Sequence, residues 1–94
     1  MAKLTEAEVG EGLRALQGWT REGEAIVKGY TFKTFAEGIR FVDRVAVAAD
    51  RADHHPDIDI RWTTVRMALS THSAGGLTRK DFDLASQIER LTAP

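Results

Sequence analysis

The chain has 94 residues, enough for one soluble domain over residues 1–94 without room for a second core. Thirteen basic and fourteen acidic residues, with no Lys/Arg cluster, exclude the charge pattern of a nucleic-acid-binding protein, and no apolar run reaches the roughly 20 residues of a membrane-spanning helix. Cysteine is absent, which excludes disulfides, thiol catalysis and cysteine-ligated zinc, and the N-terminus lacks the apolar core of a secretion signal, so we expect a cytoplasmic protein.

The first predicted helix runs from about Glu6 to Gln17. Thr5 and Glu8, at its start, have the spacing of a capping box. The apolar residues that follow share one helical face: Val9, Leu13 and Leu16. Gly18 is expected to end this helix.

Residues 19–32, with the sequence WTREGEAIVKGYTF, predict a β-hairpin. Two short runs rich in aromatic and β-branched residues flank a turn centred on Gly23. We expect Ile26, Tyr30 and Phe32 to share one face of the second strand.

The longest predicted helix opens at Thr34, which has the capping-box spacing to Glu37, and continues to about Ala52. One apolar stripe consists of Phe35, Ile39, Val42, Ala46 and Ala49. A second stripe beside it consists of Phe41, Val45, Ala48 and Ala52. One stripe is enough to cover a sheet in a small domain. The second predicts contact with another helix or, given how little surface a small domain buries, with another subunit.

Alternating apolar and polar residues predict a second hairpin over residues 57–72. Ile58, Ile60 and Trp62 are expected to face the core, ahead of a turn at Thr63-Thr64. A last helix is predicted after Thr78, with an apolar face of Leu84, Ala85, Ile88 and Leu91. The order α-β-β-α-β-β-α predicts an α+β fold in which three helices pack on one face of a four-stranded antiparallel sheet.

His54, His55 and His72 are the candidate reactive residues. Pro56 favours an extended backbone at His55, so the two adjacent imidazoles should point in different directions. A hairpin returns the chain to its starting edge, which predicts that His72 lies near the other two. Such a group could bind zinc and leave one position for water, or it could transfer protons near neutral pH. A solvated histidine loop, with Asp81 acting only as a helix cap, stays open as a third interpretation.

The sequence contains no phosphate-binding loop, serine-nucleophile elbow or dinucleotide fingerprint. A reaction that needs only proton transfers, such as a dehydration, therefore suits the available side chains best.

The spaced set D-x3-HHP from Asp50 to Pro56, then Trp62, His72 and Asp81, resembles the pterin-4a-carbinolamine dehydratases. The resemblance covers nearly the whole chain, including AGGLTRK before Asp81. It implies a lyase that converts 4a-hydroxytetrahydropterin to quinonoid dihydropterin and water in tetrahydrobiopterin recycling. It further implies histidine acid–base catalysis without a metal or organic cofactor, in a homodimer or homotetramer. In animals the same scaffold also stabilises the dimer of a homeodomain transcription factor.

By this resemblance, His54 and His72 transfer protons, His55 positions the pterin ring, and Asp81 orients an imidazole. The implied substrate-binding residues are Asp53, Pro56, Ser70, Thr71 and Ser73. The chain departs from the family pattern at two positions: Ile58 stands where an aromatic residue is common, and Lys80 stands where arginine is common. Two alternatives stay open: a non-catalytic dimerisation cofactor that binds another protein through the long helix, and a histidine-ligated zinc hydrolase.

Overall fold

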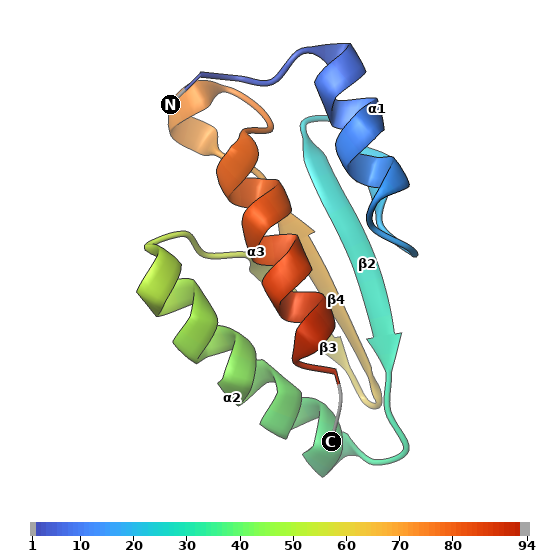
Figure 1. The fold of residues 1–94 in the computed structure, drawn as a ribbon. Helices are drawn as coiled ribbons and strands as arrows, with labels where there is room; N and C mark the ends of the chain where they lie inside the picture. Colours follow the sequence, from blue (N-terminus) through green and yellow to red (C-terminus); the bar gives the residue numbers. More distant parts are fainter. Residues whose placement is uncertain (1, 93–94) are drawn as a thin grey trace.

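A computed structural model describes residues 2–92 of the chain. Its elements follow the predicted order, with one short 3-10 helix inserted before the last α-helix (Figure 1). In chain order they are α1 (Glu6–Arg14), β1 (Thr20–Glu22), β2 (Ala25–Thr31), α2 (Phe35–Ala52), β3 (Asp57–Arg61), β4 (Thr64–Leu69), η1 (His72–Ala74) and α3 (Arg79–Arg90).

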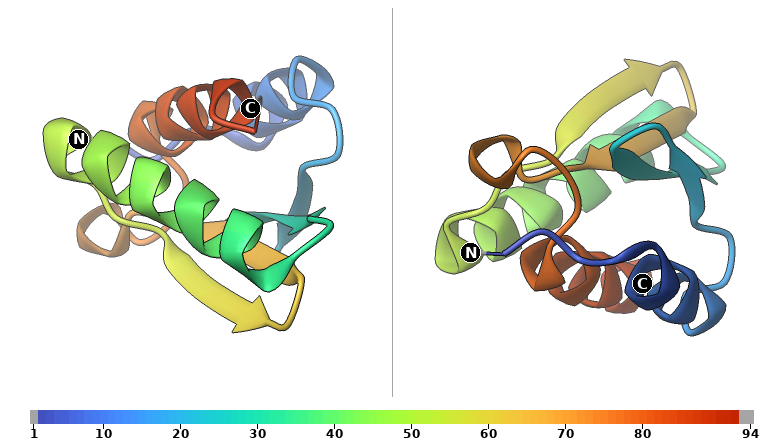
Figure 2. Two further views of the ribbon diagram at one scale, coloured as in Figure 1. Left: turned by 90° about the horizontal axis from the view of Figure 1, so that it is seen from below. Right: turned by 90° about the horizontal axis from the view of Figure 1, so that it is seen from above.

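The four strands form one antiparallel sheet in the spatial order β1-β2-β4-β3. Val65 on β4 lies opposite Tyr30 on β2 and opposite Ile60 on β3. Residues opposite each other on neighbouring strands point to the same face, and for these three it is the face toward the helices. Figure 2 shows α1, α2 and α3 on one side of the sheet and the other side uncovered. The predicted fold class is therefore confirmed.

The hydrophobic core lies between the sheet and the helices. α2 contributes Phe41 and Val45, which are fully buried, and Phe41 packs against the ring of Tyr30 with centroids 4.9 Å apart. The face of α3 that completes the core consists of Leu84, Ala85 and Ile88. The largest residues of the second α2 stripe thus pack inside the domain and are not free for a subunit contact. The exposed large apolar residues of α2 are instead Phe35 and Val47.

α1 is shorter than predicted. Its capping box is present, but the helix ends at Arg14 and not near Gln17. The N–H groups of Ala15 and Leu16 bond to carbonyl oxygens three residues back, each at 3.2 Å. The chain therefore tightens into a turn before Gly18, whose φ of 84° is easily adopted by glycine.

Trp62 does not lie in the core, contrary to the prediction. Arg61 pairs with Thr64, so the hairpin turn begins at Trp62, one residue earlier than expected. Trp62 has a φ of 51°, and two-residue hairpin turns require a positive φ at their first residue. Its side chain leaves the alternation of β3 and is 79% exposed.

A polar network at the C-terminal end of α3 is centred on Glu89. Lys28 Nζ lies 2.9 Å from both carboxylate oxygens, and the Tyr30 hydroxyl and the Trp19 indole N–H donate to one of them. Burial alone would raise the pKa of Glu89, but these hydrogen bonds outweigh it and hold that pKa below its ordinary value. Burial and the adjacent carboxylate together raise the pKa of Tyr30 far above its ordinary value. The network joins α3 to β2 and to the segment before β1.

Candidate functional site

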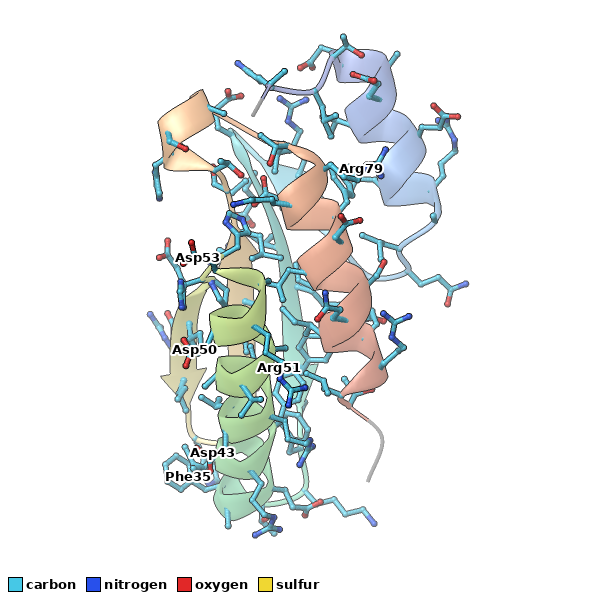
Figure 3. The ribbon with its side chains drawn as sticks, turned by 60° about the vertical axis from the view of Figure 1, so that its left-hand side comes forward. Phe35, Asp43, Asp50, Arg51, Asp53 and Arg79 are labelled. Carbon is cyan, nitrogen blue, oxygen red and sulfur yellow. The ribbon has the colours of Figure 1, made fainter. Side chains whose placement is uncertain are left out.

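The end of α2 positions the histidine loop. The helix ends in a left-handed residue, Asp53, with a φ of 49°. The N–H of the next residue, His54, still donates to the Ala49 carbonyl at 3.1 Å. This cap turns the chain away from the helix axis, and Figure 3 shows Asp50 and Asp53 at the same end of α2. His54 therefore enters the site from a fixed backbone.

His54 and Asp81 form a buried pair that joins the end of α2 to the beginning of α3. His54 Nε2 lies 2.5 Å from Asp81 Oδ1. The side chain of His54 is 10% exposed and that of Asp81 is fully buried. A carboxylate in this position fixes the orientation and the tautomer of the imidazole.

The other oxygen of Asp81 is also occupied. Its Oδ2 accepts hydrogen bonds from the Thr78 N–H and from the Thr71 hydroxyl, each at 2.9 Å. Thr78 is the N-cap of α3 and completes a capping box with Asp81. The carboxylate also lies in the first turn of α3, where the helix dipole stabilises negative charge. Asp81 thus both caps its helix and contacts the histidine, so it does not act only as a helix cap.

His55 faces a different partner from its neighbour. Its Nε2 lies 2.9 Å from Asp50 Oδ1, and both side chains are exposed. The two adjacent imidazoles therefore diverge, one into the protein and one toward solvent, as the position of Pro56 predicts. The chain thus holds one buried and one exposed histidine–aspartate pair side by side.

His72 is the first residue of η1 and is exposed. Within residues 2–92 its ring makes no hydrogen bond or ion pair. The residue before it, Thr71, is buried and contacts Asp81. The loop that carries His72 is therefore attached to the same carboxylate that holds His54.

The remaining predicted site residues have varied surroundings. The Ser70 hydroxyl donates to the Glu24 carbonyl at 2.6 Å in an exposed contact, whereas the Thr71 hydroxyl is engaged inside the protein. Asp53 and Ser73 are exposed, and Pro56 is half-buried. The contact between Thr71 and Asp81 was not predicted, because no local spacing links residue 71 to residue 81. The contact between Thr78 and Asp81 is the helix cap expected from the sequence.

No group of three or more His, Asp or Glu side chains in the described part of the chain is arranged to hold a metal ion. The zinc alternative therefore has no supporting arrangement of ligands there. Between residues 2 and 92, no helix has the length and apolarity needed to cross a bilayer.

The fold places the chain among small α+β proteins in which helices cover one face of an antiparallel sheet. The buried His54–Asp81 pair consists of an imidazole and a carboxylate, the groups that acid–base chemistry uses. The family model described as pterin 4 alpha carbinolamine dehydratase matches residues 2–91. The chain belongs to this family.

Individual relatives agree with this assignment. A protein of Roseiflexus sp. (strain RS-1), provisionally named pterin-4-alpha-carbinolamine dehydratase, is 53% identical and aligns over 95% of this chain and 96% of its own. A protein of Mycobacteroides abscessus with the same provisional name is 52% identical over 95% of each chain. A crystal structure from Brucella melitensis, described as a transcriptional coactivator/pterin dehydratase, is 35% identical with a TM-score of 0.93, over 97% of this chain and 99% of that one.

A more distant solved structure shares the fold alone. It is described as a pterin dehydratase-like protein that acts as a RuBisCO assembly factor in the alpha-carboxysome. It is 21% identical, with a TM-score of 0.70 over 82% of this chain and 92% of that one.

Proposed function

We propose that this protein is a hydro-lyase that removes water from a 4a-hydroxytetrahydropterin to yield quinonoid dihydropterin, as a step of tetrahydrobiopterin recycling. The observation that carries the proposal is the buried contact between His54 Nε2 and Asp81 Oδ1, in a chain of the dehydratase family. The family assignment supports the substrate class, and the geometry of the pair supports the proton chemistry.

The dehydration needs two proton transfers. The hydroxyl group on the ring-fusion carbon leaves as water after it receives a proton, and the adjacent ring nitrogen loses a proton as the carbon–nitrogen double bond forms. One group must therefore act as an acid and another as a base. We assign these transfers to His54 and His72, with His55 positioning the ring.

The contact with Asp81 determines which ring nitrogen of His54 can exchange a proton with the substrate. When Nε2 carries its proton toward the carboxylate, Nδ1 of the neutral ring is left as the acceptor, and Nδ1 of the protonated ring is a donor. Nδ1 is thus the atom that exchanges a proton with the substrate. General acid–base help of this kind contributes roughly 10²–10⁴ in rate, or about 3–5 kcal/mol. That is adequate here, because the carbinolamine is already activated by its own nitrogen.

The proposal is tested with His54→Ala and His72→Ala, assayed on 4a-hydroxytetrahydropterin by the absorbance of the quinonoid product. Each variant is expected to lose most of the activity, by about 10²–10⁴, and to keep the wild-type circular dichroism spectrum. His55→Ala is the matched comparison, because His55 is exposed and is expected mainly to raise KM. Full activity in both His54→Ala and His72→Ala would refute the assignment.

A homo-oligomer formed through α2 is a second proposal. Phe35 and Val47 are each 51% exposed on this helix, and burying them against a second copy would add to the limited apolar surface that a domain of this size buries. Figure 3 shows Phe35 at the end of α2 opposite to the histidine loop. Val47→Asp is expected to yield a smaller species in light scattering and to keep dehydratase activity. An unchanged molar mass would contradict this interface. The cytoplasmic location stays a prediction from the sequence.

A further inference from the structure

Thr71 lies where the chain leaves β4 and enters the loop that carries His72. Its N–H donates to the Gly76 carbonyl at 3.0 Å, and its own carbonyl accepts from the Gly76 N–H at 3.3 Å and the Ala74 N–H at 3.0 Å. These backbone bonds close residues 71–76 into a tight loop around η1. The backbone of Thr71 thus determines where His72 begins.

The loop is also held from outside. The Leu4 N–H donates to the Leu77 carbonyl at 2.8 Å, which ties the N-terminal segment to the loop exit. A Cβ built at Gly76 would lie 2.6 Å from Glu24 Oε2 and 2.8 Å from Lys3 Cε, so these two side chains lie directly against the backbone of the loop. The Leu4–Leu77 bond and the Lys3 and Glu24 side chains therefore hold and cover the loop that carries His72.

The side chain of Thr71 points the other way, into the protein. Its Oγ1 lies 2.9 Å from Asp81 Oδ2 and 2.9 Å from Thr78 Oγ1, and all three residues are buried. A hydroxyl has one proton, and an ionised carboxylate can only accept. The Thr71 proton therefore goes to Asp81, and Thr71 Oγ1 accepts the proton of the Thr78 hydroxyl. This leaves Asp81 Oδ1 free to face His54 alone.

We propose that Thr71 is a positioning residue that couples the two proton-transfer histidines. Its hydroxyl fixes the carboxylate of Asp81, which in turn orients the ring of His54, and its backbone holds the loop that carries His72. This inference rests on the proposed function. It replaces the role expected from the resemblance, in which Thr71 binds the substrate directly, because a buried hydroxyl that already donates to Asp81 has no second proton to offer a ligand.

The test compares Thr71→Val, which keeps the shape and loses the hydroxyl, with Thr71→Ser, which keeps the hydroxyl. The control is Thr64→Val, where an exposed threonine on β4 makes only a 3.4 Å contact with the Thr31 hydroxyl. In Thr71→Val we expect kcat to fall by roughly ten- to a hundredfold with KM unchanged, because a small misplacement of a reacting group can cost about a hundredfold in rate. We also expect the NMR signal of the His54 Nε2 proton to shift or broaden, and both effects to be absent in Thr71→Ser and Thr64→Val.

Two results would overturn the inference: an unchanged His54 signal in folded Thr71→Val, or a raised KM with unchanged kcat, which would identify Thr71 as a substrate-binding residue. If Thr71→Val does not fold, Thr71→Cys takes its place with the same outcomes, since a thiol is only a weak donor. The NMR comparison does not depend on turnover. If the wild-type protein fails to dehydrate the pterin, the proposed function fails, and the NMR result still decides whether Thr71 positions His54.

Discussion

Replacing Asp81 with asparagine is expected to lower kcat by about 10²–10⁴, the range that acid–base catalysis contributes, and to leave the domain folded. The carboxylate accepts three hydrogen bonds, one from His54 at Oδ1 and two from Thr71 and Thr78 at Oδ2. An amide replaces one of these oxygens with an NH2 group, which can only donate. The outcome therefore depends on which way the amide turns.

The hydrogen-bond count determines the orientation. With NH2 at the Oδ2 position, both the Thr71 hydroxyl and the Thr78 N–H would lose their acceptor. With NH2 at the Oδ1 position, only His54 is affected, so this orientation is preferred. The amide then donates to Nε2, the proton of the neutral ring moves to Nδ1, and the atom that should accept a proton from the substrate can no longer do so. The cost in stability is the loss of one charge-assisted hydrogen bond, about 1.5–3 kcal/mol, which is less than the roughly 5–15 kcal/mol by which domains are stable.

The assay combines turnover with the tautomer of His54. Dehydration is followed by product absorbance, and nitrogen chemical shifts of the labelled imidazole report which ring nitrogen carries the proton. Asp83→Asn is the matched control, because it is the same chemical change at an exposed position two residues along α3. Wild-type turnover in Asp81→Asn would show that the carboxylate is not needed to set the tautomer of His54. So would a loss of turnover in a variant whose His54 tautomer is unchanged.

Three further predictions concern stability and are checked by urea denaturation. The folded-state pKa of Glu89 lies below its ordinary value of 4.5, so ionised Glu89 stabilises the fold above pH 4.5, and this stabilisation is lost as the pH falls through the folded pKa. The wild type should therefore lose more stability on acidification than Glu89→Gln. Curves of unfolding free energy against pH that run parallel for the two proteins would contradict this. Trp62→Ala should cost no more than about 0.5 kcal/mol, as for an exposed side chain, whereas a cost of about 3–5 kcal/mol would place the ring in the core. Gly12→Ala should destabilise by about 1–3 kcal/mol, because a Cβ there would lie 2.6 Å from Phe82 Cε1. Gly10 lies in the same helix, and a Cβ there would have Arg14 Nη1 as its nearest neighbour, at 3.8 Å. Gly10→Ala should therefore stabilise the protein by about 0.5–1 kcal/mol. Equal effects of the two substitutions would contradict the close contact between Gly12 and Phe82.

Local patterns predicted those parts of the fold that depend on local interactions. The capping box at Thr5 lies where its spacing placed it, α3 begins directly after Thr78, and the Gly23 turn joins the first two strands. The second hairpin was predicted with its turn one residue too late. Alternation alone cannot distinguish the last residue of an edge strand from the first residue of a turn, and this one-residue shift moved Trp62 from the expected core to the surface.

The candidate site was predicted less completely, because its contacts join segments that are far apart in the sequence. The histidines and Asp81 could be named from their resemblance to a family pattern. The bonds from Thr71 to Thr78 and Asp81 exist only once β4 and α3 are packed together. The same holds for the network around Glu89, whose partners come from β2 and from the segment before β1.

A crystal structure of the protein with a bound dihydropterin would test most directly whether His54 and His72 act on the pterin. If these two histidines transfer the protons, the pterin ring lies between His54 and His72, with its reacting edge in hydrogen-bond contact with His54 Nδ1 while Nε2 stays on Asp81. A pterin bound on the uncovered face of the sheet, or a His54 whose Nδ1 faces away from the ligand, would contradict it.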